Sequence, residues 1–92
     1  MKSIVVLSNM PYAQAKVIRH MDGSVSLVSY ATEVVHITAA GWLTVYGLYS
    51  QTTRKHIGAF MKEYANAYYQ TANAVYENHN RYNVHTGEIE PL

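Results

Sequence analysis

The chain has 92 residues, no cysteine and a formal net charge of +1. This length allows one domain with a modest core. The absence of cysteine excludes a disulfide scaffold, a thiol nucleophile and a thiolate metal site. The small net charge argues against long-range attraction to nucleic acid or to an anionic membrane. We therefore expect any charged partner to be met by a local patch, and we expect no membrane contact.

Extended segments dominate the first half of the chain. The N-terminal apolar run is too short for a signal peptide or a membrane span, and its β-branched residues predict a strand. The Asp22-Gly23 pair predicts a tight hairpin turn, and Ala39-Ala40-Gly41 predicts a second hairpin loop. The expected strands cover residues 3–7, ended by Ser8-Asn9-Met10-Pro11, and then residues 15–21, 24–30, 32–38 and 42–49. We expect Ser24, Ser26 and Ser29 to face water or a partner.

The second half of the chain changes to helical spacing. A helix is predicted over about residues 52–77. The stripe expected to face the sheet consists of Ile57, Phe60, Met61, Tyr64, Tyr68, Ala72 and Val75. The alternative is a break near Asn66, after which a second short helix folds back. From residue 78 the periodicity is lost, which predicts an irregular C-terminal tail over residues 78–92.

The fold expected from these elements is α+β, in a single domain over residues 1–77. It consists of an antiparallel β-meander of four strands, with the N-terminal strand as a candidate fifth, packed against one long C-terminal α-helix. Trp42 should be at least partly buried, because it is the only tryptophan and starts a strand after a turn glycine.

The start of the predicted helix is the first candidate binding site. Ser50, Thr52 and Thr53 are all able to cap the helix, and Arg54, Lys55 and His56 then fill its first turn. Cations at this end oppose the helix macrodipole, so a bound anion or an acidic partner would explain them. The alternative is purely structural: a threonine caps the helix, Arg54 and Lys55 are solvated, and the ring of His56 packs beside Phe60.

Tyrosine is the second candidate feature, since the chain has nine tyrosines and only 14% charged residues. Tyrosine is enriched in interface cores, and the candidate binding residues are Tyr30, Tyr49, Tyr68, Tyr69 and Tyr76. A single sheet with one helix would leave an apolar sheet face uncovered, which predicts a two-fold homodimer. The residues expected on that face are Val28, Tyr30, Val35, Ile37, Val45 and Tyr49. The alternative is that the tyrosines line a small core with hydrated hydroxyl groups.

No motif for catalysis or metal binding is present. The five histidines show neither a helical i, i+4 pair nor a compact cluster with carboxylates, so we expect no metal site. The sequence has no nucleophile elbow, no phosphate-binding glycine loop and no paired carboxylates. We therefore expect a protein without enzymatic activity and without a cofactor.

Two segments resemble a family of small uncharacterised bacteriophage and prophage proteins. They are Ser29-Tyr30-Ala31-Thr32 with Val34-Val35, and Val45-Tyr46-Gly47 with Tyr49-Ser50-Gln51-Thr52-Thr53-Arg54-Lys55-His56-Ile57. Ala31 stands where the family usually has asparagine, and Arg54-Lys55 stand where it usually has serine and arginine. The resemblance covers roughly residues 27–64 and implies a phage origin rather than a mechanism.

Compact phage proteins commonly bind host machinery, so the expected function is a protein-protein inhibitor of a host defence complex, of anti-CRISPR or anti-restriction type, in the host cytoplasm. The partner would be a host or phage protein. The alternative is a nucleic-acid-binding or phosphate-binding module that uses the basic helix N-terminus. Salt dependence separates the two, because phosphate contacts weaken steeply as salt rises.

Overall fold

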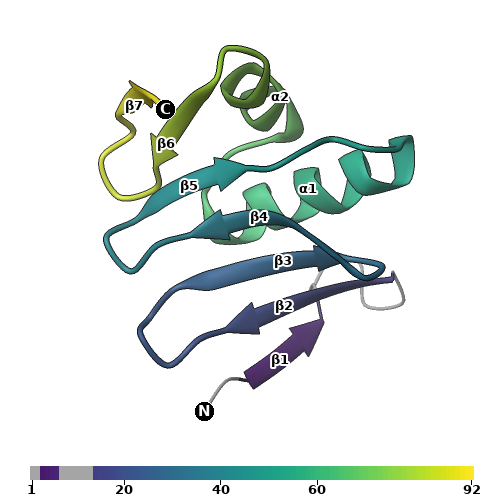
Figure 1. The fold of residues 1–92 in the computed structure, drawn as a ribbon. Helices are drawn as coiled ribbons and strands as arrows, with labels where there is room; N and C mark the ends of the chain where they lie inside the picture. Colours follow the sequence, from purple (N-terminus) through teal and green to yellow (C-terminus); the bar gives the residue numbers. More distant parts are fainter. Residues whose placement is uncertain (1–2, 7–13) are drawn as a thin grey trace.

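The computed structural model describes residues 3–6 and 14–92, which form one antiparallel sheet and two helices (Figure 1). The seven strands lie in the sheet in chain order, each antiparallel to its neighbours. They are β1 (Ser3–Val6), β2 (Ala15–Arg19), β3 (Val25–Ser29), β4 (Thr32–Ile37), β5 (Trp42–Val45), β6 (Asn80–Asn83) and β7 (Ile89–Pro91). The helices α1 (Gln51–Tyr64) and α2 (Tyr69–Glu77) lie between β5 and β6. The predicted α+β class and antiparallel meander are confirmed, while the strand and helix counts are larger than expected.

Both predicted hairpins are present. Gly23 and Gly41 have φ angles of +91° and +97°, which glycine adopts without the steric penalty of a Cβ atom. The carboxylate of Asp22 accepts hydrogen bonds from the backbone N–H and the hydroxyl group of Ser24 and so fixes the first turn. The stop predicted at residues 8–11 lies outside the described residues.

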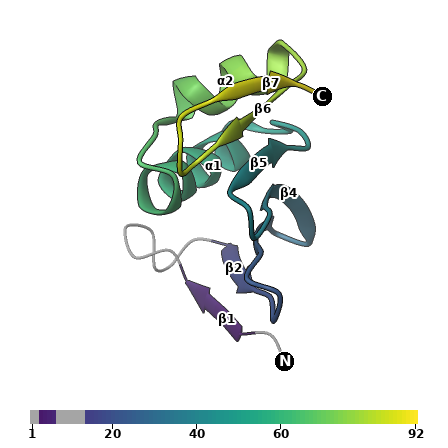
Figure 2. The ribbon, with the colours of Figure 1, turned by 90° about the vertical axis from the view of Figure 1, so that its left-hand side faces the viewer.

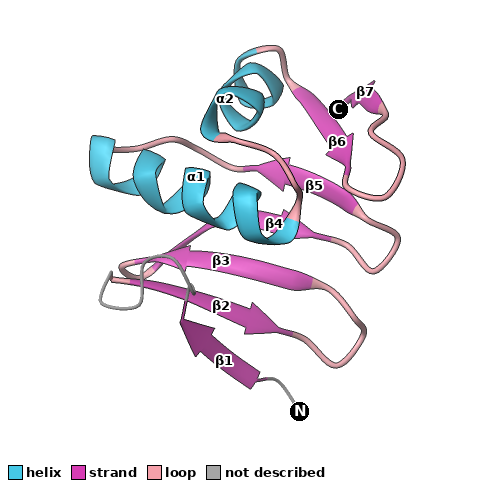
Figure 3. Ribbon diagram, turned by 180° about the vertical axis from the view of Figure 1, so that it is seen from behind, coloured by secondary structure: helices cyan, strands magenta, loops and turns pink. Residues whose placement is uncertain are grey.

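The helices cover one face of the sheet and leave the other face open (Figures 2 and 3). Leu27, Val35 and Val45 are cross-strand neighbours in β3, β4 and β5, and all three are buried. They belong to the same core cluster as Ile57 and Phe60 of α1. Because neighbouring residues of a strand point to opposite faces, Ser26, His36 and Thr44 lie on the open face.

The predicted exposure of three serines is wrong. Ser24, Ser26 and Ser29 are all buried, with exposed fractions of 5%, 1% and 3%. Each one hydrogen-bonds to a neighbouring side chain. The partner of Ser24 is Asp22 in the same turn, whereas the histidine partners of Ser26 and Ser29 lie on other elements, which the local sequence does not reveal.

The apolar face proposed for a homodimer is also wrong in its composition. Val35, Ile37 and Val45 are buried in the core beneath the helices. The residues next to them in the chain, which point to the open face, include His36 and Thr44, and both are polar. This face therefore gives the predicted dimer less apolar area than the sequence suggested.

The helix α1 begins at Ser50 and ends before Asn66. The hydroxyl oxygen of Ser50 accepts the backbone N–H of Thr53 at 3.2 Å, so Ser50 is the N-cap. Asn66 has a φ angle of +51°, a left-handed conformation that asparagine tolerates at a helix end. The N–H groups of Ala65 and Ala67 both donate to the carbonyl of Met61, which closes the turn.

The single long helix predicted over residues 52–77 is thus two helices, and the alternative break near Asn66 is correct. Ala72 and Val75 are the buried residues of α2 and form its inner face. Tyr68, placed in the sheet-facing stripe by its spacing, lies after the break and is 63% exposed. No helix in the described part of the chain is long and apolar enough to span a membrane.

The irregular tail predicted for residues 78–92 is instead a hairpin made of β6 and β7. The side chain of Asn83 accepts the N–H groups of His85 and Thr86 and donates to the carbonyl of Ala40, which joins the tail to the β4–β5 hairpin. The guanidinium group of Arg81 lies 4.2 Å from the ring centroid of Trp42. The partial burial predicted for Trp42 is confirmed.

Candidate functional site

The predicted site at the helix start separates into inward-facing and outward-facing residues. Thr53 and His56 are buried against the sheet, with exposed fractions of 4% and 2%. Thr52, Arg54 and Lys55 are exposed. This division follows from helix geometry, because residues three apart share a face while their immediate neighbours do not. The five residues therefore do not form one anion site.

The inward-facing residues Thr53 and His56 form a polar network with the buried Ser29 of β3 and the exposed Ser50, which we call the docking network. The hydroxyl group of Ser29 lies 2.8 Å from Nδ1 of His56 and 3.2 Å from the hydroxyl oxygen of Thr53. Ser50 donates its hydroxyl hydrogen to the same oxygen of Thr53. The network thus fastens the first turn of α1 to the end of β3. It also explains why His56, a polar ring, is tolerated in the core.

Burial lowers the pKa of His56, because the charged imidazolium form loses hydration inside the protein. A neutral ring can still hydrogen-bond to Ser29 through Nδ1 in either tautomer. His56 is therefore suited to a structural role and poorly suited to binding an external anion. The ring of His56 contacts that of Tyr30, at 5.9 Å between ring centroids.

Two of the candidate tyrosines border the docking network. Tyr30 and Tyr49 have φ angles of +58° and +50° and are 57% and 64% exposed. A left-handed conformation costs a non-glycine residue on the order of 1–3 kcal/mol and persists where the surroundings impose it. Tyr30 is the first residue of the two-residue turn between β3 and β4, where a positive φ angle suits a tight hairpin. The chain neighbours of the two tyrosines, Ser29 and Ser50, both belong to the docking network. The segments of residues 29–32 and 49–57 therefore meet at the docking network.

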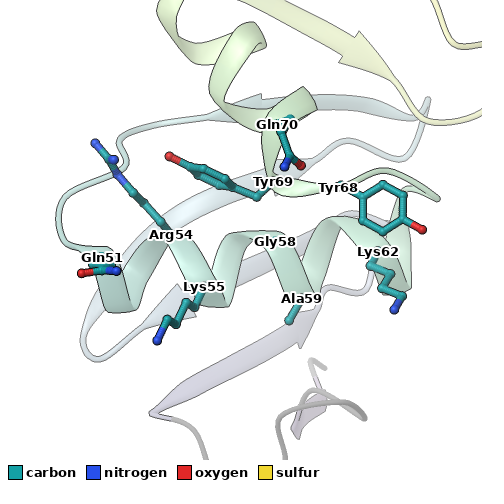
Figure 4. A pocket seen from close by; sticks show the side chains of 9 residues that line it. All are labelled: Gln51, Arg54, Lys55, Gly58, Ala59, Lys62, Tyr68, Tyr69 and Gln70. Carbon is teal, nitrogen blue, oxygen red and sulfur yellow. The ribbon is translucent and has the colours of Figure 1, made fainter.

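Two of the outward-facing residues, Arg54 and Lys55, line a groove of about 630 Å³ between α1 and the start of α2, which we call the cationic groove (Figure 4). Its lining consists of Gln51, Arg54, Lys55, Gly58, Ala59, Lys62, Tyr68, Tyr69 and Gln70. Three of these side chains are cationic and none is acidic. The groove unites four of the predicted binding residues, namely Arg54, Lys55, Tyr68 and Tyr69.

Small residues on α1 allow the groove walls to approach. A Cβ atom added to Gly58 would lie 3.0 Å from the Cβ atom of Tyr69, so glycine lets α2 begin close to α1. In Figure 4 the ring of Tyr69 extends from the start of α2 along α1 on the side of Arg54. The ammonium group of Lys62 lies 6.0 Å from the ring centroid of Tyr68, which sets a cation beside an exposed aromatic face.

The helical spacing would have revealed two groove residues that the sequence analysis missed, Gly58 and Lys62. Arg54, Gly58 and Lys62 follow one another at intervals of four residues, which places them on one helix face. Gln70 could not have been found in this way, because its position depends on the break after Tyr64. Tyr76 is 38% exposed on α2 but does not line the groove.

The sequence predicted no compact cluster of histidines and carboxylates, and this prediction is wrong. His20, Glu33 and His36 converge on the open face of the sheet, with one ligand atom from each within 4.8 Å of the others. They come from the end of β2 and from β4, so the pairing of strands joins them across 16 residues of sequence. No histidine spacing within one element could have indicated this.

The fold and the groove define a small α+β protein with a single antiparallel sheet, one helical layer and a cationic surface on the helices. The chain belongs to a family of unknown function, DUF8033, whose sequence pattern matches residues 2–78, from the N-terminal strand through α2. No curated protein and no solved structure matches the chain. The resemblance to phage proteins stays a prediction.

Proposed function

We propose that this protein is a non-enzymatic binding protein that holds an acidic segment of a partner protein in the cationic groove. The observation that carries the proposal is that Arg54, Lys55 and Lys62 line one groove together with two tyrosines, and that no lining residue is acidic. Arginine and tyrosine contribute disproportionately to protein interfaces. The three cations around the groove would give the acidic segment its orientation.

The resemblance to phage proteins supports a more specific form of this proposal. The partner is then a protein of the host, and the protein inhibits a host defence complex of anti-CRISPR or anti-restriction type in the host cytoplasm. Occupation of the nucleic-acid-binding surface of such a complex does not suit this groove, because that surface and the groove are both basic. An acidic segment of the complex is the matching target.

Single-stranded nucleic acid is the second candidate ligand. Tyr68 and Tyr69 lie beside cations, and aromatic rings next to a basic groove are the usual elements of a platform on which bases stack. The net charge of +1 favours the protein partner, because it supplies little long-range attraction to a polyanion.

The test is a titration with two labelled probes, a peptide of alternating glutamate and tyrosine and an oligothymidine. We expect the peptide to bind, and the Arg54→Glu/Lys55→Glu/Lys62→Glu protein to lose that binding. The matched control is Lys16→Glu, which reverses an exposed cation on β2 outside the groove. Equal binding by the control and the groove variant would contradict a role for the groove.

The salt dependence of binding distinguishes the two candidate ligands. Oligothymidine binding that falls steeply between about 50 and about 200 mM salt would instead support the nucleic-acid alternative. Absence of binding by both probes would contradict the proposal in both forms.

Homodimerisation is a separate proposal that rests on exposed aromatic and aliphatic side chains. Tyr46 and Ile4 are 48% and 59% exposed, and β1 is at an edge of the described sheet. Light scattering at tens of micromolar should give the mass of two chains. A mass of one chain would contradict the dimer and leave the groove proposal intact.

A further inference from the structure

The strongest unassigned feature is the cluster of His20, Glu33 and His36 on the sheet face opposite the helices. Ser26 and His36 are directly opposed in β3 and β4, and Ser26 is also opposed to Ile18 in β2. His20 follows Ile18 by two residues and so returns to the same face. The cluster is therefore built on three neighbouring strands, and it shares no residue with the cationic groove.

The hydroxyl group of Ser26 sets the distance between the two rings. Its oxygen lies 2.8 Å from Nε2 of His20 and 3.1 Å from Nδ1 of His36. The carboxylate of Glu33 lies 3.5 Å from the same nitrogen of His36. Ser26 is only 1% exposed, so it forms a fixed floor under the cluster, whereas the side chains of His36 and Glu33 are 27% and 42% exposed.

This set of donor atoms matches a known class of metal site. Two imidazoles and one carboxylate bind zinc and related divalent transition metals and leave a further coordination position for water or another ligand. Ligand atoms bound at about 2.1 Å to a tetrahedral ion lie roughly 3.4 Å apart. The ligand atoms here already lie within 4.8 Å of one another, so rotation of the exposed Glu33 and the half-buried histidines would bring them to that spacing.

We propose that His20, Glu33 and His36 form a binding site for one divalent transition-metal ion of the zinc class. Imidazole nitrogens give selectivity against magnesium and calcium, which prefer oxygen ligands. The ion would displace the hydrogen bonds that Ser26 makes to the rings and link β2 to β4 across β3. Because those hydrogen bonds alone could hold the two rings, the experiment must distinguish a metal site from a polar cluster.

The experiment is a calorimetric titration of the protein with zinc alone, at about pH 7.5, where imidazole is mostly unprotonated. We expect one zinc ion per chain and no saturable binding of magnesium. Glu33→Gln should raise the Kd at least about tenfold, and His20→Asn/His36→Asn should abolish binding. The matched control is His79→Asn, which removes an exposed histidine elsewhere and keeps a residue that tolerates the φ angle of +54° found there.

A thermal melt with and without zinc makes the test independent of how well the double variant folds. Zinc should raise the Tm of the wild-type and His79→Asn proteins, and at the same zinc concentration it should raise the Tm of the Glu33→Gln protein by less. Glu33 is exposed, so this single change should leave the fold intact. Absence of 1:1 binding in the wild type, or an unchanged Kd in Glu33→Gln and the double variant, would overturn the proposal. Neither result would affect the cationic groove.

Discussion

The docking network and the cationic groove take their residues from the same turn of α1, yet they differ in almost every physical property. Thr53 and His56 point to the sheet, are buried and are hydrogen-bonded. Arg54 and Lys55 lie between them in sequence, point outward and are exposed. A run of polar residues at a helix start can thus serve stability on one face and recognition on the other. The two regions should respond in opposite ways to substitution.

The largest effect is expected from His56→Ala, on the docking network. It removes a fully buried ring and leaves the hydroxyl group of Ser29 without this partner, so the free energy of unfolding should fall by roughly 2–4 kcal/mol. Urea denaturation measures the change. The matched control is Lys55→Ala on the outward face, which should change stability by no more than about 0.5 kcal/mol. Similar losses for both variants would contradict the division into two faces.

A moderate effect is expected from Ser50→Ala. The backbone N–H of Thr53 loses its acceptor, so the free energy of unfolding should fall by about 0.5–2 kcal/mol. Thr52→Ala is the control, because Thr52 is exposed and Ser50 is the capping residue. If the threonine variant is the more damaging of the two, the cap is assigned incorrectly.

Acidification should destabilise the protein through His56. Its pKa in the folded protein lies below the ordinary value of 6.5, so as the pH falls below about 6.5 the unfolded chain binds a proton more readily than the folded chain. The neutral ring of His56 therefore contributes its full stabilisation above about pH 6.5, and the free energy of unfolding decreases as the pH falls from there toward the lower pKa of the folded protein. Thermal melts from about pH 8 to about pH 5 would measure this decrease.

The matching control replaces His56 by glutamine, which keeps a polar side chain but does not titrate. The decrease in Tm over this window should become smaller in His56→Gln. Asp22 does not titrate in this pH range, because the hydrogen bonds donated by Ser24 lower its pKa below 3.8. Its contribution to stability is therefore lost only at a pH below the range of the melts. An unchanged pH profile would show that His56 is not the group responsible.

The smallest effect on stability is expected from Arg54→Glu/Lys55→Glu. Both side chains are exposed near the N-terminus of α1, where negative charge agrees with the helix macrodipole. The Tm should stay the same or rise slightly, by an amount equivalent to a gain of about 0.3–1 kcal/mol per residue. A marked fall in Tm would mean that these cations have a structural role.

The sequence predicted those parts of the fold that depend on local chemistry. The turns at Gly23 and Gly41 require positive φ angles, and both glycines were recognised. The start of α1 was also found, because capping residues and helical spacing are local signals. The end of α1 was left open, since it depends on Asn66 adopting a left-handed conformation.

The parts that the sequence did not predict depend on contacts between distant segments. The tail forms β6 because it pairs with β5, and Asn83 hydrogen-bonds to Ala40, which lies 43 residues earlier. Ser29 is buried because His56 lies above it, 27 residues later. The cationic groove was predicted in part, through Arg54, Lys55, Tyr68 and Tyr69, but its shape depends on the fold-back of α2.

The most direct test of the two-face account compares stability and binding in one protein. The Arg54→Glu/Lys55→Glu/Lys62→Glu variant should melt close to the wild-type temperature, because the gain at the N-terminal end of α1 offsets the loss of the Lys62 cation from the last turn. The variant should no longer bind the labelled acidic peptide. Loss of binding together with a retained Tm would assign recognition to the outward face alone. Retained peptide binding in this folded variant would contradict the account.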